Sequence, residues 1–163
     1  QLSAHRGRRH TDAEIVRLAA PLHDVGKVGI PDHVLNKPGK LDSAEWEIMQ
    51  SHATLGHDML KDSKRPVLRA GAIIAHEHHE HWNGGGYPNG KAGEDIHSYG
   101  RISALADVFD ALGSRRCYKE PWEIDEILDH LRAQRGKQFE PTLVDILMSR
   151  IAEFAALRES FPD

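Results

Sequence analysis

Helix-start signals recur along this chain and constrain its fold more than any other feature. Two capping boxes, Thr11 with Glu14 and Asp42 with Glu45, each precede apolar residues at helical spacing. Three prolines also stand where a helix would begin: Pro66, Pro121 and Pro141. No alternating stretch of useful length indicates a β-strand. The pattern predicts an all-α fold of about six or seven helices.

The same signals give approximate positions for the helices. The first helix is expected from about Asp12 into His23, despite Pro21, and the second begins after Asp42 and carries its apolar spacing to Leu60. The third is expected from residue 66 toward residue 80, and Gly136 is expected to end the helix that Pro121 opens. Residues 101–112 are apolar nearly all round, which predicts a buried central helix. The glycine-rich segment 82–100 is expected to form an ordered but irregular loop.

Composition bounds the class of protein. The chain has 163 residues, enough for one domain with one core. Its net charge of -4 provides no global field for DNA or an anionic membrane, so any phosphate binding must be local. A single cysteine, Cys117, excludes an internal disulfide framework and a thiolate zinc cluster. No membrane-length apolar run or signal-peptide layout is present, so we expect a cytoplasmic protein, cut from something longer because it begins with Gln1.

The chain has twelve histidines, and this excess favours a metal site made of imidazole and carboxylate ligands. His23 and Asp24 follow an apolar helix, although such a dipeptide is common by chance and also fits an exposed helix end. His52 faces inward on its amphipathic helix, where a core histidine bonded to a carbonyl is the ordinary alternative. His78 and His79 lie at the end of another apolar helix. Consecutive side chains on a helix differ by about 100° in direction, so these two histidines reach one site only if the cations lie between their directions or two cations bind.

Asp107 is the carboxylate for which a purely structural role is hardest to find. It is embedded in an apolar segment, where an unpaired buried charge would cost several kcal/mol and a metal would remove that cost. Asp110 shares its helix face, and its role stays open. Six residues thus form a possible ligand set: His23, Asp24, His52, His78, His79 and Asp107. Such ligands suit iron, manganese or zinc, with cobalt or nickel possible, and two cations about 3.5 to 4 Å apart would favour phosphate ester hydrolysis.

Several motifs in a fixed order resemble the HD-GYP family of phosphodiesterases. The resemblance covers about Glu14 to Leu147. The motifs are His23-Asp24-Val25-Gly26-Lys27, Gly29-Ile30-Pro31-Asp32, Lys37-Pro38-Gly39, His78-His79-Glu80-His81-Trp82-Asn83-Gly84-Gly85-Gly86-Tyr87-Pro88, Ala106-Asp107-Val108-Phe109-Asp110-Ala111-Leu112, Tyr118-Lys119 and Phe139-Glu140-Pro141.

The resemblance implies an all-α HD-domain bundle with an irregular Gly-Tyr-Pro loop over residues 11–163, after a basic segment at 1–10. It implies hydrolysis of cyclic di-GMP to pGpG or GMP by a metal-activated hydroxide, with the six residues above as ligands of two or three divalent metals. Lys27 would contact the scissile phosphate or a metal-bound water, while Tyr87, Arg116 and Lys119 would bind the dinucleotide. Expected partners are an N-terminal regulatory domain and, through the loop, diguanylate cyclase or other signalling proteins.

The chain departs from the family pattern at Asn83, Gly100 and Cys117, where Asp, Ala and Pro are usual. It also lacks an upstream helix with a Glu and a His four residues apart that helps to complete the family's metal centre. His5 and His10 have the wrong spacing to replace it, so an N-terminal truncation is the simplest explanation. Two alternatives stay open: an HD phosphohydrolase of another nucleotide, which would lack the Gly-Tyr-Pro loop, and a non-catalytic module that binds cyclic di-GMP or partner proteins.

Overall fold

The computed structural model describes residues 11–114 and 122–154, and every regular element in these ranges is helical. The α-helices are α1 (Asp12–Ala19), α2 (Asp32–Leu35), α3 (Ser43–Gln50), α4 (His52–Leu60), α5 (Pro66–Glu77), α6 (Ser98–Gly113), α7 (Ile124–Gln134) and α8 (Pro141–Ser149). Three short 3-10 helices are η1 (Ala20–Leu22), η2 (Val25–Gly29) and η3 (Gly93–Asp95). Only isolated β-bridges occur in the described ranges. The all-α prediction is confirmed.

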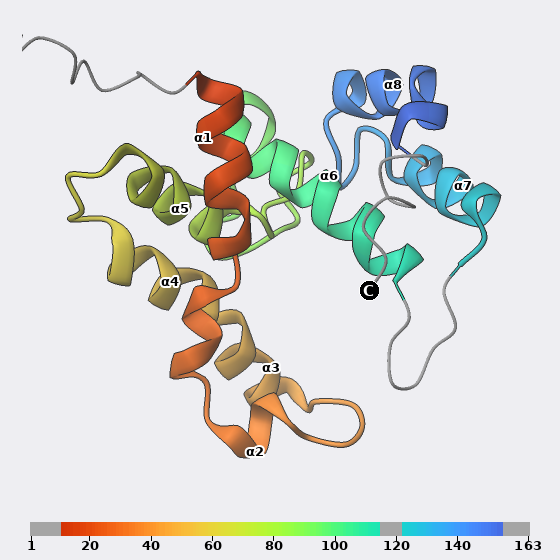
Figure 1. Ribbon diagram of the computed structural model, residues 1–163. Helices are drawn as coiled ribbons and strands as arrows, with labels where there is room; N and C mark the ends of the chain where they lie inside the picture. Colours follow the sequence, from red (N-terminus) through yellow and green to blue (C-terminus); the bar gives the residue numbers. More distant parts are fainter. Residues whose placement is uncertain (1–10, 115–121, 155–163) are drawn as a thin grey trace, which may run out of the picture.

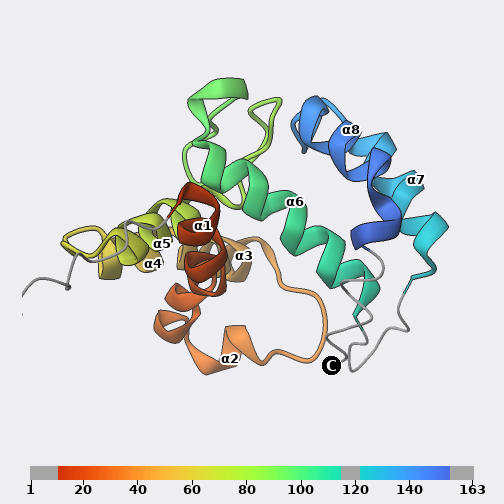
Figure 2. The ribbon, with the colours of Figure 1, turned by 45° about the horizontal axis from the view of Figure 1, so that its top comes forward.

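Helix α6 crosses the middle of the molecule and separates two groups of helices (Figures 1 and 2). On one side, α5 packs against α1, α4 and α6, with a small core around Ala19, Ala70 and Ile74. On the other side, α7 and α8 pack against α6 around a larger core that includes Phe139 and Leu131. Helix α5 therefore has neighbours on several sides, and side chains from several helices can meet beside it.

The first predicted helix is present, but its last turn is tighter than expected. The Thr11 and Glu14 capping box starts α1, which ends at Ala19 and continues as the 3-10 helix η1. Pro21 has no N–H to donate to the carbonyl four residues earlier, which accounts for the change of helix type. The chain then reaches His23 and Asp24 without a further α-helical turn.

The second predicted helix is divided in two at Ser51. The Ser51 hydroxyl donates to the Ile48 carbonyl, and the His52 ring lies 2.7 Å from the Met49 carbonyl through Nδ1. Both carbonyls would accept only backbone N–H groups in a continuous helix, so these side chains compete with the helix at the break. This division and the short α2 give eight α-helices in the described ranges rather than six or seven.

The helix boundaries near residues 136 and 141 agree with the sequence, whereas the burial of α6 does not. Gly136 follows α7 with φ +73°, and Pro141 is the first residue of α8, both as predicted. The central helix α6 is not buried all round, because Ile102 is 41% exposed and Asp110 is also exposed.

Pro121, Cys117 and residues 1–10, the predicted basic segment, lie outside the described residues. Across the described part of the chain, none of the helices has the length and apolar character needed to span a membrane.

The capping box at the start of α3 gives a first testable prediction. Asp42 accepts from the Glu45 N–H at 2.9 Å, and Glu45 accepts from the Asp42 N–H at 2.8 Å. Replacing Asp42 with alanine removes one half of this exchange, so we expect a loss of about 1 kcal/mol in the free energy of unfolding. Urea denaturation followed by circular dichroism measures it. Asp62→Ala, an exposed aspartate after α4, serves as the control, and equal midpoints for the two variants would contradict a stabilising cap.

Candidate metal centre

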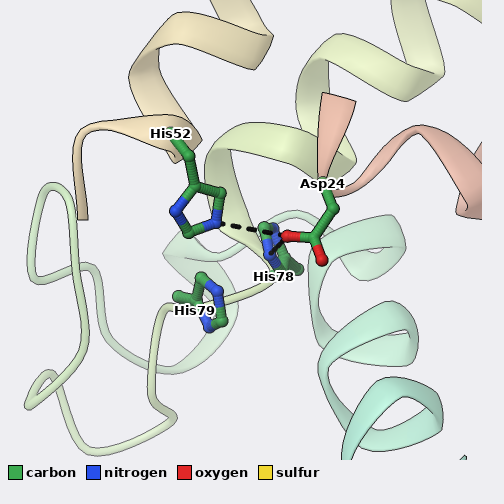
Figure 3. Close-up of side chains that lie close together, drawn as sticks. All are labelled: Asp24, His52, His78 and His79. Carbon is green, nitrogen blue, oxygen red and sulfur yellow. Dashed lines mark ion pairs between the residues drawn. The ribbon is translucent and has the colours of Figure 1, made fainter. Parts of the chain in front are cut away.

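Four of the six predicted ligands meet in one cluster. Asp24, His52, His78 and His79 each offer a ligand atom, and these atoms lie within 4.8 Å of one another. Asp24 lies between η1 and η2, His52 begins α4, and the two histidines follow the last turn of α5. Figure 3 shows the rings of His52 and His78 directed toward the Asp24 carboxylate, with His79 beside them. Nitrogen and oxygen donors from three chain segments therefore converge.

Backbone carbonyls orient the histidine rings in this region. Nδ1 of His52 lies 2.7 Å from the Met49 carbonyl, and Nδ1 of His78 lies 3.0 Å from the Ile74 carbonyl. His23 makes the same type of contact, through Nδ1 to the Ala20 carbonyl at 2.9 Å. A carbonyl can only accept, so Nδ1 carries the proton and Nε2 keeps its lone pair. This is the arrangement that metal-ligating histidines commonly have.

Three ligand atoms at the centre of the cluster have no hydrogen-bond partner within the described part of the protein. Asp24 Oδ1, His52 Nε2 and His78 Nε2 are buried and make no hydrogen bond. Burial lowers the pKa of His52, and it lowers the pKa of His78 to about 4 and that of His79 to about 2. The rings are therefore neutral near pH 7. Buried polar atoms without partners are costly, and neutral imidazoles facing a carboxylate are the donors that a divalent cation binds, so these residues fit a metal.

Asp24 connects the cluster to a second group of residues. Its Oδ1 lies 3.5 Å from His52 Nε2 and 3.8 Å from His78 Nε2. Its Oδ2 lies 3.3 Å from His23 Nε2 and 2.5 Å from Lys27 Nζ. Burial opposes ionisation of this carboxyl, but the nearby His23 ring and the Lys27 ammonium outweigh burial and hold its pKa well below the usual range. An ionised carboxylate with its two oxygens directed to different groups can bridge two cations.

His23 and Asp107 form the other side of this second group. His23 Nε2 lies 3.6 Å from Asp107 Oδ1, which brings α6 to the site. The expectation that Asp107 is buried is wrong, because its side chain is 37% exposed. It faces a cavity of about 580 Å³ between α1 and α6, which Arg17, Ile102 and other residues of both helices line. The carboxylate is therefore accessible from solvent while remaining next to His23.

Close backbone packing brings Asp24 and His52 together. A Cβ atom at Gly26 would lie 2.0 Å from the His52 carbonyl oxygen and 2.5 Å from the Gly56 nitrogen. Only glycine fits where η2 crosses α4 so closely. Because Gly26 is two residues after Asp24, this crossing sets the distance between the carboxylate and the His52 ring.

Tyr87 forms the outer wall of the site. Its ring stacks on the His79 ring with centroids 4.6 Å apart. Burial and the nearby carboxylates of Asp24 and Asp107 raise the pKa of its phenol, so the hydroxyl stays protonated as a donor. Trp46 makes an edge contact with Tyr87 at 6.2 Å, and its side chain is 47% exposed. Reasoning from the sequence missed Trp46, because an exposed tryptophan on an amphipathic helix gives no signal of its own.

The remaining predicted residues fall into two groups. Lys27 is at the site and pairs with Asp24. Arg116 and Lys119, the predicted dinucleotide-binding cations, lie outside the described residues. Two further histidines, His57 and His76, are not members of the cluster; their rings stack on each other with centroids 4.4 Å apart.

Comparison with known proteins gives consistent matches. Residues 2–143 match a family model described as HD domain. The chain is 52% identical over 157 residues to 3'3'-cGAMP-specific phosphodiesterase 2 of Vibrio cholerae, covering 96% of this chain and 30% of that protein. It is 46% identical over 155 residues to a cyclic di-GMP phosphodiesterase response regulator of Xanthomonas campestris, covering 95% of this chain and 41% of that protein.

A solved structure matches as well. The fold is similar to the crystal structure of a cyclic GMP-AMP specific phosphodiesterase of Vibrio cholerae, with a TM-score of 0.59 and 26% identity. That match covers 85% of this chain and 38% of the other. The chain therefore spans well under half the length of each of these proteins.

Proposed function

Since this chain belongs to the HD domain family, we propose that it is a metal-dependent phosphodiesterase that hydrolyses a cyclic dinucleotide. One observation carries the proposal: three buried ligand atoms from separate segments face one another without hydrogen-bond partners. A bound cation would satisfy all three atoms at once.

The proposed ligands divide around Asp24. His52, His78 and His79 would hold a cation with Asp24 Oδ1, while His23 and Asp107 would hold another with Oδ2. Mixed imidazole and carboxylate ligation favours iron or manganese, with zinc, nickel or cobalt as further possibilities. When bound, a pair of divalent cations lowers the pKa of a coordinated water and stabilises negative charge on phosphoryl oxygens.

The protein groups around the centre would bind and orient the substrate. Lys27 Nζ, beside Asp24, places a positive charge where a scissile phosphate would enter. Tyr87 offers an aromatic face for a base and a protonated hydroxyl for a phosphate oxygen. Arg116 and Lys119 stay predictions for contacts to the second phosphate, whose negative charge a basic side chain would meet.

The first candidate substrate is cyclic di-GMP. The order of the sequence motifs and the similarity to the Xanthomonas response regulator support it. A second candidate is 3'3'-cGAMP, which the relative with 52% identity over 96% of this chain favours. The two molecules differ in one base, so the metal centre can serve both, and contacts to the bases must discriminate between them.

Product analysis tests the proposed function. The purified protein is loaded with manganese or with iron under anaerobic conditions, then incubated separately with cyclic di-GMP, 3'3'-cGAMP and a nucleoside triphosphate. Chromatography of the products is expected to show linear dinucleotide or mononucleotide from a cyclic dinucleotide only. Release of product from the triphosphate alone would support a different HD phosphohydrolase. Binding of a cyclic dinucleotide without any cleavage by the metal-loaded protein would support a binding module instead.

Tyr87 gives a prediction for the binding step. Replacing it with alanine removes the ring that stacks on His79, and we expect KM for the cyclic dinucleotide to rise about tenfold with a smaller change in kcat, as the loss of one base-stacking contact implies. Steady-state kinetics of the manganese form measures both constants. Tyr99→Ala is the control, because this tyrosine pairs with Asp12 on α1 and not with the site. An unchanged KM in Tyr87→Ala would remove Tyr87 from the substrate pocket.

A further inference from the structure

Two buried carboxylates flank the paired histidines, and neither belongs to the metal cluster. Glu77 is 6% exposed and Glu80 is 2% exposed. Burying a carboxylate without partners is costly, so the hydrogen bonds that each one accepts show which part of the chain it holds. Both are directed at the loop that follows them, residues 82–97, and this loop carries Tyr87.

Glu80 binds the loop through two backbone N–H groups. Its Oε1 accepts from the Asn89 N–H at 2.8 Å, and its Oε2 accepts from the Lys91 N–H at 2.9 Å. Each oxygen of the carboxylate thus holds one residue of a short segment directly after Tyr87 and Pro88. Hydrogen bonds with a charged acceptor are stronger than neutral ones, and the Glu80 carboxylate that accepts these two is buried.

Backbone contacts complete the attachment on the other side of Tyr87. The Tyr87 N–H donates to the His79 carbonyl at 3.1 Å, and the Gly84 N–H donates to the His81 carbonyl at 2.8 Å. A Cβ atom at Gly86 would lie 2.3 Å from the His81 nitrogen, so the loop backbone rests directly on the segment that carries the histidine ligands. Tyr87 is held before and after its own position, with its ring on His79.

Glu77 anchors the end of the same loop. Its Oε1 accepts from Lys91 Nζ at 2.6 Å, and its Oε2 accepts from the His97 N–H at 2.5 Å. Lys91 therefore contacts both carboxylates, one through its backbone and one through its side chain. The two anchors differ in place: Glu80 fixes the residues next to Tyr87, whereas Glu77 fixes the return of the chain into α6.

We infer that Glu80 is a positioning residue for the substrate site, which holds the Gly-Tyr-Pro loop so that the Tyr87 ring stays stacked on His79. It is not a ligand in this arrangement, because both of its oxygens are occupied by backbone donors and the cluster of mutually close ligand atoms in the described ranges does not include it. The inference rests on the proposed function for its kinetic consequence. The attachment of the loop itself does not depend on that function.

The test combines Glu80→Gln and Glu80→Ala with two kinds of measurement. Glutamine keeps the shape and one acceptor but presents an NH₂ group to the second N–H; alanine removes both acceptors. Hydrogen exchange followed by mass spectrometry is expected to show amides of residues 84–91 exchanging at least about tenfold faster in Glu80→Ala, with Glu80→Gln in between, while α5 amides keep their protection. In the manganese form of Glu80→Ala, KM for the cyclic dinucleotide is expected to rise about tenfold relative to wild type. The amount of manganese bound per chain is expected to stay unchanged.

Glu94→Gln is the matched control, because Glu94 is an exposed glutamate in the same loop and is expected to behave as wild type. Wild-type exchange in residues 84–91 of Glu80→Ala would overturn the inference. Loss of bound manganese with the loop still protected would also overturn it, since Glu80 would then belong to the metal centre. If the wild-type protein neither binds nor cleaves a cyclic dinucleotide, the proposed function fails, and the exchange measurement alone decides whether Glu80 holds the loop.

Discussion

Replacing Asp24 with alanine is expected to lower kcat/KM for the cyclic dinucleotide by at least about a thousandfold, or about 4 kcal/mol of transition-state stabilisation. The reason is geometric. Asp24 faces His52 and His78 with one oxygen and His23 with the other, so its removal takes a ligand from both halves of the proposed centre. Lys27 also loses its partner in the site.

The same variant has a readout that does not depend on activity. Manganese is expected to raise the unfolding temperature of the wild-type protein, because a ligand that binds only the folded state stabilises it. The Asp24→Ala variant is expected to show little or no rise, and elemental analysis should find little bound manganese. Asp58→Ala is the control, since this exposed aspartate on α4 pairs with Lys61 away from the cluster. Wild-type manganese binding by Asp24→Ala would contradict the assignment of Asp24.

Replacing Gly26 with alanine is expected to destabilise the fold by about 3 kcal/mol, at the upper end of what overpacking usually costs. The new methyl group would overlap the His52 carbonyl oxygen and the Gly56 nitrogen, and both are backbone atoms that cannot rotate away. The 3-10 helix η2 must therefore move off α4. Because that movement separates Asp24 from His52, manganese binding should weaken as well.

Gly29→Ala tests the same kind of change on the same 3-10 helix. There, a Cβ atom would meet only the end of the Leu55 side chain, at 3.0 Å, and that side chain is partly exposed and can turn aside. We expect its stability to stay within about 1 kcal/mol of wild type. Urea denaturation of both variants gives the comparison. Equal midpoints would show that the crossing at Gly26 is not the tight contact described above.

Much of the fold followed from local signals in the sequence. The capping boxes at Thr11 and Asp42 start α1 and α3, and Pro66 and Pro141 start α5 and α8, because these signals act over three or four residues. The inward direction of His52 was also predictable, since its helical spacing from apolar neighbours places it on the buried face. These features depend on interactions between residues that are close in the sequence.

The features that were not predictable depend on contacts between distant segments or on competing side chains. The break at Ser51 arises because Ser51 and His52 side chains use carbonyls of the preceding turn. Asp107 is partly exposed because α6 borders a cavity, although its own segment is apolar. The loop attachment by Glu80 joins residues nine and eleven positions apart, and no local pattern in the glycine-rich segment indicates it.

The most direct test of the central claim, that these histidines and Asp24 hold the metal of a phosphodiesterase, is anomalous diffraction from crystals of the manganese-loaded protein, measured at energies on both sides of the manganese edge. A peak is expected within ligand distance of Asp24 Oδ1, His52 Nε2 and His78 Nε2, with His79 beside it. If the crystals instead show these atoms hydrogen-bonded to water or to each other, with manganese bound elsewhere or not at all, the claim is contradicted.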